Sequence, residues 1–243
     1  MKQLALGVRL RADAVFESFA PGLNGELIAA LRGGASAPLW MWGSEGSGKT
    51  HLLQAVCAST ADTGAGAAAP DAAAGHAAAA YFPLERSLAL PPAALTGFEN
   101  CRVLCLDDVD AVAGDLQWEQ ALFRLFNEAA ELGTRLIFAA RAAPRGIDWS
   151  LEDWRSRAAA CVVYQLRDLD DAGRLEALRL RAAQRGLQLP YETSEYLLKR
   201  MPRDMHSLFA VLDQLDEASL VAQRRLTIPF IRDALEKHAK TKS

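Results

Sequence analysis

Residues 43–50, Gly-Ser-Glu-Gly-Ser-Gly-Lys-Thr, decide the fold that this sequence predicts. They fit the pattern G-x-x-x-x-G-K-[ST] in full, which defines the P-loop. An apolar run at residues 38–42, typical of a buried strand, precedes them, and residues 50–59 follow with apolar side chains at helical spacing. A strand, a glycine-rich loop and a helix in this order form the context that supports a phosphate-binding loop.

The residue types in this loop suit a nucleoside di- or triphosphate. Glycines let the backbone curl so that its N–H groups face the phosphates, and the following helix presents its positive end to the anion. Lys49 is expected to reach the β- and γ-phosphates, and Thr50 is expected to ligate Mg²⁺. A chance glycine loop is the alternative, and the matching context argues against it. The predicted nucleotide-binding residues of the loop are Gly43, Ser44, Glu45, Gly46, Ser47, Gly48, Lys49 and Thr50.

A second motif, Val-Leu-Cys-Leu-Asp-Asp at residues 103–108, reads as an apolar strand ending in acids, the Walker B pattern. Asp107 is expected to hold Mg²⁺, directly or through water. Asp108 is expected to polarise the attacking water, as a catalytic residue. The alternative for Asp108 and Asp110 is that they are solvated loop acids.

Composition indicates a soluble globular protein with a sizeable core. Hydrophobic residues make up 51% of the chain and charged residues 23%, with a net charge of -3, so charge alone does not predict a nucleic-acid surface. No apolar stretch reaches about 18 residues, so we expect a cytoplasmic protein without a membrane span. The four cysteines form no C-x-x-C pair and are expected to be buried free thiols: Cys57, Cys101, Cys105 and Cys161.

Strands alternate with helices up to residue 167, and only helices follow. The alternation predicts an α/β domain with a parallel sheet over residues 13–167. Residues 168–243 predict a small all-helical domain, and the Ala/Gly-rich residues 63–75 predict a mobile surface insertion. Further strands are expected near residues 81–83, 102–106, 135–140 and 162–166, and helices at 24–31, 117–132, 171–185, 194–200, 204–223 and 229–240.

This order of P-loop, Walker B motif, fifth strand and helical lid resembles the AAA+ ATPases, and within them the DnaA initiator branch. Three segments resemble the Hda regulators of that branch. Residues 113–119, AGDLQWE, are similar to their A-G-D-x-x-W-E, and residues 211–230, VLDQLDEASLVAQRRLTIPF, to their last lid helices. Phe16-Glu17-Ser18-Phe19 resembles the T-F-x-x-F element that leads into the adenine pocket. The resemblance implies a P-loop AAA+ parallel-sheet domain with a helical lid, which binds ADP or ATP with Mg²⁺ through the loop and Phe16.

Hda proteins promote hydrolysis of the ATP held by DnaA when they are docked on the DNA-loaded sliding clamp. The resemblance therefore implies a negative regulator of replication initiation, with DnaA and the β subunit of DNA polymerase III as partners. Residues 1–12 would be the clamp-binding peptide, in which Gln3, Leu4, Leu6 and Val8 are similar to the family's Gln-Leu-x-Leu-x-Leu. Without that resemblance, a short alternating terminus equally fits a strand or a frayed end.

The resemblance also assigns an arginine finger. Residues 153–157, Asp-Trp-Arg-Ser-Arg, align with the D-x-x-S-R of the family, so Arg157 is the residue expected to reach a partner's γ-phosphate. Arg155 lies two residues away and could be mistaken for it. A surface arginine at the subdomain boundary is the alternative reading of Arg157.

Two sensor positions depart from the AAA+ pattern. The polar residue expected after the fourth strand falls in Ala139-Ala140-Arg141, and the lid arginine aligns with His206, with Arg203 one turn earlier. These departures predict weak or no ATPase activity of the chain itself. Whether Arg141, Arg203 or His206 replaces a sensor is open at this point, and Arg203 and His206 are kept as nucleotide-binding candidates.

Two other functions remain as alternatives. An autonomous P-loop ATPase or nucleotide kinase is permitted by the loop and opposed by the missing sensor. A replication initiator or helicase loader would need a DNA-binding element. The sequence after residue 168 fits a lid, without a basic recognition helix, so little direct DNA binding is expected. Because AAA+ sites lie at subunit interfaces, the resemblance also raises the expectation of a homo-oligomer.

Overall fold

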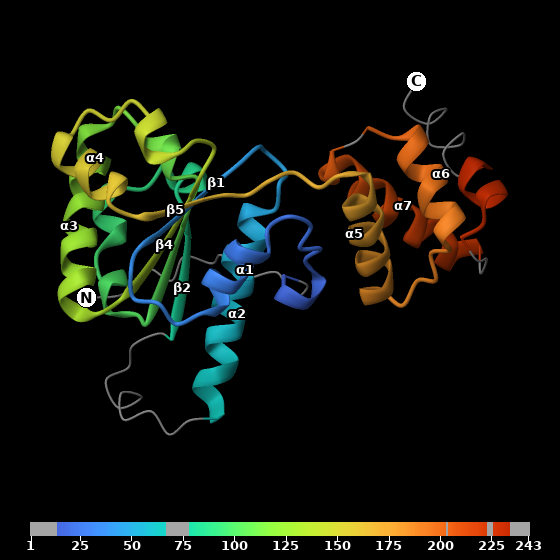
Figure 1. The fold of residues 1–243 in the computed structure, drawn as a ribbon, viewed down its shortest axis with the longest axis horizontal. Helices are drawn as coiled ribbons and strands as arrows, with labels where there is room; N and C mark the ends of the chain where they lie inside the picture. The colour runs from blue at the N-terminus through green and yellow to red at the C-terminus, as the bar shows by residue number, and fades with distance from the viewer. Residues whose placement is uncertain (1–13, 67–77, 203, 223–225, 234–243) are drawn as a thin grey trace. The chain divides into compact units, whose positions relative to one another are not determined.

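The computed structural model describes residues 14–66, 78–202, 204–222 and 226–233 of the chain. The chain divides into two compact units (Figure 1). The first comprises Met1–Phe16 and Asn24–Asp168, and the second comprises Glu17–Leu23 and Leu169–Ser243. The segment Glu17–Leu23 thus groups with the helical unit, whereas the predicted α/β domain runs without interruption from residue 13.

A five-stranded parallel sheet forms the centre of the first unit (Figure 1). Its order is β2-β3-β4-β1-β5, and every neighbouring pair is parallel. The carboxyl ends of β1, β3 and β4 therefore meet at one edge, which brings the segments that follow these strands together. The predicted parallel α/β sheet is confirmed. The strands are β1 (Leu39–Trp42), β2 (Ala79–Pro83), β3 (Val103–Asp107), β4 (Arg135–Ala140) and β5 (Val162–Gln165).

Helices accompany the sheet: α1 (Gly25–Arg32), α2 (Lys49–Gly66), α3 (Leu116–Leu132) and α4 (Glu152–Ala159). The first three match expected helices, but α2 runs seven residues past the predicted end at residue 59, although the two glycines of this continuation, Gly64 and Gly66, have low helix propensity. Residues 63–66 of the predicted insertion belong to α2, and the part from residue 67 on lies outside the described residues. The sequence did not predict α4, since only Trp154 and Ala158 of its eight residues are buried.

Aromatic side chains fix α4 to the rest of the first unit. Trp154 is fully buried, and its ring centroid lies 5.7 Å from that of Phe138 on β4, 5.8 Å from that of Trp149 and 6.3 Å from that of Phe126 on α3. Trp40 on β1 extends this cluster, 5.6 Å from Phe138. A large buried ring compensates for the polar composition of a short helix. As predicted, all four cysteines are buried and free.

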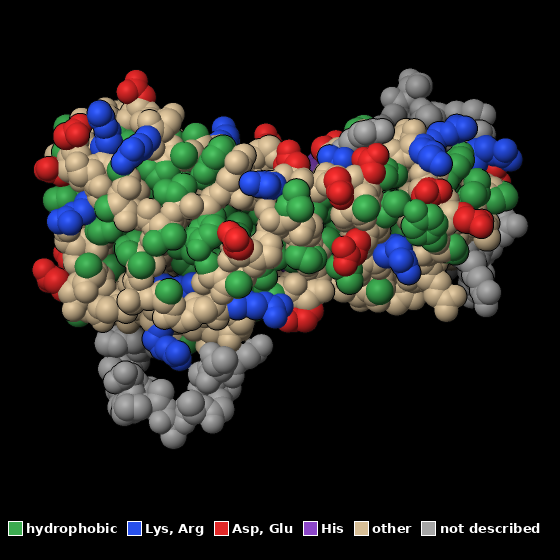
Figure 2. Space-filling model, viewed as in Figure 1, with side chains coloured by type: hydrophobic (Ala, Val, Ile, Leu, Met, Phe, Trp, Pro, Cys, Tyr) green, Lys and Arg blue, Asp and Glu red, His purple; other side chains and the backbone are tan. Residues whose placement is uncertain are grey.

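The second unit is all-helical in its described part, as predicted. It contains α5 (Asp171–Gln184), α6 (Tyr191–Arg200) and α7 (Met205–Ala222), and residues 228–233 are also helical. Buried leucines from α5, α6 and α7 form its core. On the face in view, Lys and Arg side chains are interspersed with Asp and Glu (Figure 2). None of the helices in the described ranges is long and apolar enough to cross a membrane.

Candidate functional site

The loop at residues 43–48 leaves β1 and leads directly into α2, the position that the motif predicts. At its start, Gly43 donates its N–H to the carbonyl of Ala140, at 3.3 Å. A Cβ at Gly43 would lie 2.5 Å from the carbonyl oxygen of Leu166, so only glycine fits. Gly48 has a φ of 103°, in the left-handed region that favours glycine. The buried hydroxyl of Ser47 has no hydrogen-bond partner in the described part of the chain, which suits a loop that receives a phosphate oxygen.

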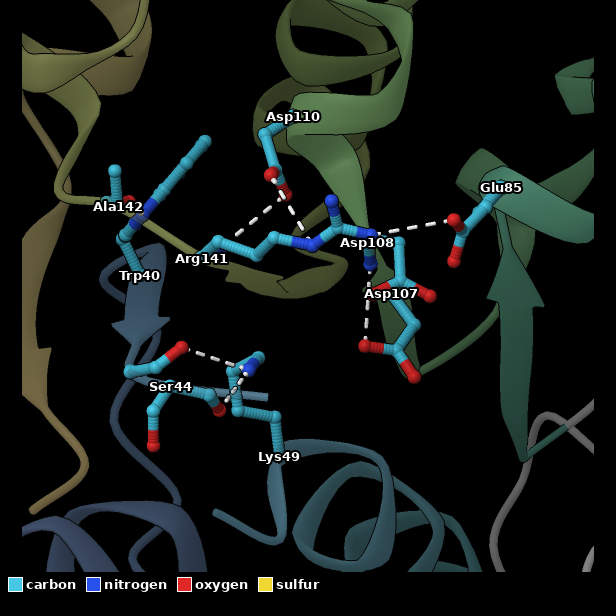
Figure 3. Close-up of polar contacts among 10 residues, drawn as sticks. Trp40, Ser44, Lys49, Glu85, Asp107, Asp108, Asp110, Arg141 and Ala142 are labelled. Carbon is cyan, nitrogen blue, oxygen red and sulfur yellow. Dashed lines mark hydrogen bonds and ion pairs between the residues drawn. The ribbon is translucent and has the colours of Figure 1, made fainter. Parts of the chain in front are cut away.

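Lys49 lies inside this loop and is only 7% exposed. Its Nζ donates to the carbonyl oxygens of Gly43 and Ser44, both at 2.8 Å (Figure 3). Burial lowers the pKa of Lys49, and the nearby carboxylates of Asp107 and Asp108 oppose this effect. An entering phosphate therefore competes with two carbonyl oxygens for this ammonium group.

The two predicted Mg²⁺ ligands meet at the end of β3. The Thr50 hydroxyl donates to Oδ2 of the buried Asp107 at 2.6 Å. Oxygen donors from a hydroxyl and a carboxylate are the ligands that Mg²⁺ prefers, with phosphate oxygens and water completing its shell. This pair therefore fits the ion, and when bound the ion would neutralise phosphate charge beside Lys49.

Tyr81 is a member of this site that the sequence did not predict. Its hydroxyl donates to the same Oδ2 of Asp107 at 2.8 Å. Burial raises the pKa of Tyr81, and the Asp107 carboxylate adds to the shift, so the hydroxyl keeps its proton. The available signal was indirect: Tyr81 lies in a predicted strand, and β2 pairs with β3 so that Pro83 lies opposite Asp107.

Asp108 has a strained and charged environment. Its φ of 53° is in the left-handed region, the one such value at a described non-glycine residue. Burial raises the pKa of Asp108 to about 6, and the carboxylates of Asp107, Glu85 and Asp110 add to the shift. A shifted carboxyl beside a P-loop suits a functional role better than a solvated loop acid does.

Arg141 follows β4 and lies at the same edge as the Walker B acids (Figure 3). Its Nη2 is 3.2 Å from Oε1 of Glu85, its Nε is 4.0 Å from Oδ2 of Asp110, and its backbone N–H donates to Oδ1 of Asp110 at 3.2 Å. Of the three candidate sensors, Arg141 thus has a described position beside the loop. His206 is exposed in the first turn of α7, in the second unit, and Arg203 lies outside the described residues.

The segments on either side of the loop are bonded to it or to its helix. The Ser44 hydroxyl donates to Oδ1 of Asp168, just before the second unit begins. Nε2 of His51 on α2 bonds the carbonyl of Val15 at 2.9 Å, next to the predicted adenine-site residue Phe16. Phe16 is buried, and the guanidinium of Arg32 lies over its ring.

Arg157 projects from α4 and is exposed. Its guanidinium carbon lies 5.9 Å from the ring centroids of both Phe123 and Phe126 on α3. Within the described residues Arg157 forms no ion pair, whereas Arg155 is paired with Glu152 at 3.2 Å. Cation–π contact orients a guanidinium without occupying its hydrogen-bond donors. This geometry distinguishes the two arginines and favours Arg157 as the one available to a partner.

The predicted clamp-binding residues Gln3, Leu4, Leu6 and Val8 lie outside the described residues, so that assignment stays a prediction.

Comparisons with known proteins agree with this geometry. Residues 10–165 match the family model of the bacterial DnaA ATPase domain, and residues 171–235 match that of the Hda lid domain. Domain III of the replication initiation protein DnaA from Thermotoga maritima is similar, with a TM-score of 0.76 and 20% identity over 94% of this chain and 98% of that one. AMPPCP-bound DnaA from Aquifex aeolicus has a TM-score of 0.66 and 21% identity, over 96% and 70%. The RuvB Holliday junction branch migration motor of Thermotoga maritima has a TM-score of 0.60 and 13% identity, over 87% and 67%.

Proposed function

Since the chain belongs to the bacterial DnaA ATPase-domain family of AAA+ proteins, we propose that it is a negative regulator of replication initiation that promotes hydrolysis of ATP bound to DnaA. The observation that carries the proposal is Arg157, exposed on α4 and unpaired within the described residues. The match of residues 171–235 to the Hda lid supports a regulator over an initiator.

The chain binds ADP or ATP in its own P-loop under this proposal. Backbone N–H groups of residues 43–48 would surround the phosphates, and Lys49 would exchange its two carbonyl acceptors for phosphate oxygens. Thr50 and Asp107 would hold Mg²⁺, and Tyr81 would orient the carboxylate. The position after β4 carries Arg141, engaged by acids, so this nucleotide serves mainly as a ligand that sets conformation.

Arg157 supplies the chemistry to the partner. A guanidinium placed on the γ-phosphate of ATP held by DnaA stabilises charge that develops during phosphoryl transfer, and such fingers accelerate turnover by about 10³–10⁵-fold. This corresponds to roughly 4–7 kcal/mol of barrier. Leaving the two phenylalanine rings costs about 0.5–1 kcal/mol for each exposed cation–π contact. The reduction of the hydrolysis barrier therefore exceeds the free energy lost when the Arg157 guanidinium leaves the two rings.

Residues 1–12 would bind the DNA-loaded sliding clamp through Gln3, Leu4, Leu6 and Val8. In this binding mode an extended peptide places a polar side chain at the rim of a groove on the clamp and apolar side chains inside the groove. The role requires a cytoplasmic protein that meets the replicase through protein contacts rather than through its own DNA binding. We also expect the chain to self-associate through its nucleotide site, because AAA+ sites lie at subunit interfaces.

Hydrolysis of DnaA-bound ATP, measured with clamp and DNA present, tests the finger. Arg157→Ala is expected to abolish the stimulation, and Arg155→Ala, a matched change two residues away, is expected to retain it. Equal stimulation by Arg157→Ala and wild type would refute the assignment. A clamp pull-down tests the tether separately: Gln3→Ala/Leu4→Ala is expected to lose binding, and retained binding would exclude this peptide.

A further inference from the structure

A buried carboxylate on α3 connects two loops of the first unit. Glu119 is 0% exposed. Its Oε1 accepts the backbone N–H groups of Gly114 at 2.7 Å and Ser150 at 3.1 Å, and its Oε2 accepts that of Leu151 at 2.6 Å. Gly114 lies after the Walker B strand, and Ser150 and Leu151 immediately precede α4. One side chain therefore ties the segment beyond the Walker B acids to the start of the helix that carries Arg157.

The sequence at the start of α4 provides no side-chain cap for the helix. Leu151 occupies the N-cap position and forms no side-chain capping bond, because its side chain has no acceptor. Burying a carboxylate is costly unless hydrogen bonds satisfy it, and Glu119 is satisfied by three backbone donors. Glu119 thus does not replace the side-chain cap but fixes the N-cap residue and the residue before it through their own N–H groups, as the glutamate of a capping box fixes its N-cap residue.

The same face of α3 holds α4 at two places. Glu119, Phe123 and Phe126 recur at the spacing that places residues on one face of a helix. Glu119 fixes the residues before α4, and the two phenylalanine rings lie under the Arg157 guanidinium near its end. Trp154 anchors the middle of α4 in the aromatic core. Direction and position of Arg157 therefore depend on contacts made by α3.

We propose that Glu119 is a positioning residue for Arg157, an inference that rests on the proposed function. Arg157 lies six residue steps after Leu151, about 9 Å along the helix, so a tilt of about 10° moves Arg157 by about 1.6 Å. A misplacement of about 1 Å can cost on the order of 10²-fold in rate. Loss of the Glu119 bonds is expected to slow trans hydrolysis by roughly 10–100-fold.

Glu119→Gln tests this inference because it keeps the shape and replaces one acceptor by an amide donor that faces backbone N–H groups. Glu128→Gln, an exposed change on the same helix, is the matched control. Hydrolysis of DnaA-bound ATP is measured as maximal rate and as half-saturating concentration of the variant. We expect Glu119→Gln to lower the maximal rate about 10–100-fold, with unchanged half-saturation and unchanged affinity for its own nucleotide.

The split between maximal rate and half-saturation separates positioning from general damage, because a damaged fold would also change half-saturation and the affinity for the chain's own nucleotide. A Glu119→Gln variant as fast as Glu128→Gln, or one that loses nucleotide affinity in step with its rate, would overturn the inference. Full activity of Arg157→Ala alone would instead refute the proposed function.

If Glu119→Gln does not fold, amide hydrogen exchange in the wild-type protein still tests whether Glu119 holds the start of α4. The amides of Gly114, Ser150 and Leu151 are expected to exchange as slowly as those of the sheet. Fast exchange of Ser150 and Leu151 would show that the carboxylate does not hold the start of α4 and would overturn the inference.

Discussion

The Tyr81 hydroxyl gives the most quantitative test of the Walker B geometry. Tyr81→Phe removes the hydroxyl that donates to Asp107 at 2.8 Å and leaves the ring in place. A hydrogen bond to a charged group contributes about 1.5–3 kcal/mol. Because Thr50 still donates to the same oxygen, we expect a loss near the lower end, about 1.5–2 kcal/mol of unfolding free energy.

Tryptophan fluorescence during thermal or urea unfolding measures this loss in the first unit alone, since all five tryptophans belong to it. At roughly 2–4 °C per kcal/mol for a unit of this size, the midpoint should fall by about 3–8 °C. Tyr164→Phe, at a partly exposed tyrosine of the same unit whose hydroxyl forms no hydrogen bond within the described residues, is the control and should change stability by less than about 0.5 kcal/mol. Equal midpoints for Tyr81→Phe and the control would refute the bond.

Three further outcomes follow from the same site. Burial raises the pKa of Asp108 from 3.8 to about 6, so the contribution of its protonated carboxyl to stability is present below about pH 4 and is lost as the pH rises through about 6. Asp108→Asn should therefore raise the unfolding midpoint at pH 7.5 and not at pH 4. A midpoint that depends on pH in the same way for the variant and the wild type would contradict this. Gly43→Ala places a Cβ 2.5 Å from a backbone oxygen, so fluorescent-ADP binding should be lost, whereas Gly25→Ala, with open space around it, should bind normally. Arg141→Ala leaves two acids unpaired beside the phosphates, and calorimetric titration should show weaker ATP binding than for the exposed control Arg145→Ala; equal affinities would remove Arg141 from the site.

Local patterns in the sequence predicted the P-loop, the Walker B acids and the sheet, because motif and strand spacing act over a few residues. The contact between Thr50 and Asp107 follows from two such motifs at one sheet edge. The helix α4 was missed because its apolar signal is a single tryptophan and one alanine. Its stability comes from tertiary packing, which periodicity does not report.

The parts of the site that the sequence did not predict depend on long-range partners. Tyr81 bonds a residue 26 positions away, and Glu119 bonds residues 31 and 32 positions away besides the nearby Gly114. Nothing in the local sequence of Tyr81 distinguishes it from other strand residues, and the motif at residues 113–119 that contains Glu119 does not indicate which distant loop its carboxylate holds. Arg157 was assigned as the finger by resemblance, and the structure adds a difference between it and Arg155. The Arg157 guanidinium lies over aromatic rings, whereas Arg155 is paired with Glu152.

The central claim is that this chain acts through Arg157 on nucleotide bound elsewhere, and single-turnover hydrolysis of labelled ATP preloaded on DnaA tests it most directly. The chain is loaded with unlabelled ADP, and clamp and DNA are present. We expect the wild type to accelerate release of labelled phosphate, and Arg157→Ala and Arg157→Lys to reduce that acceleration by about 10³-fold or more, since lysine lacks the planar fork. Acceleration by Arg157→Ala equal to that of the wild type would contradict the account.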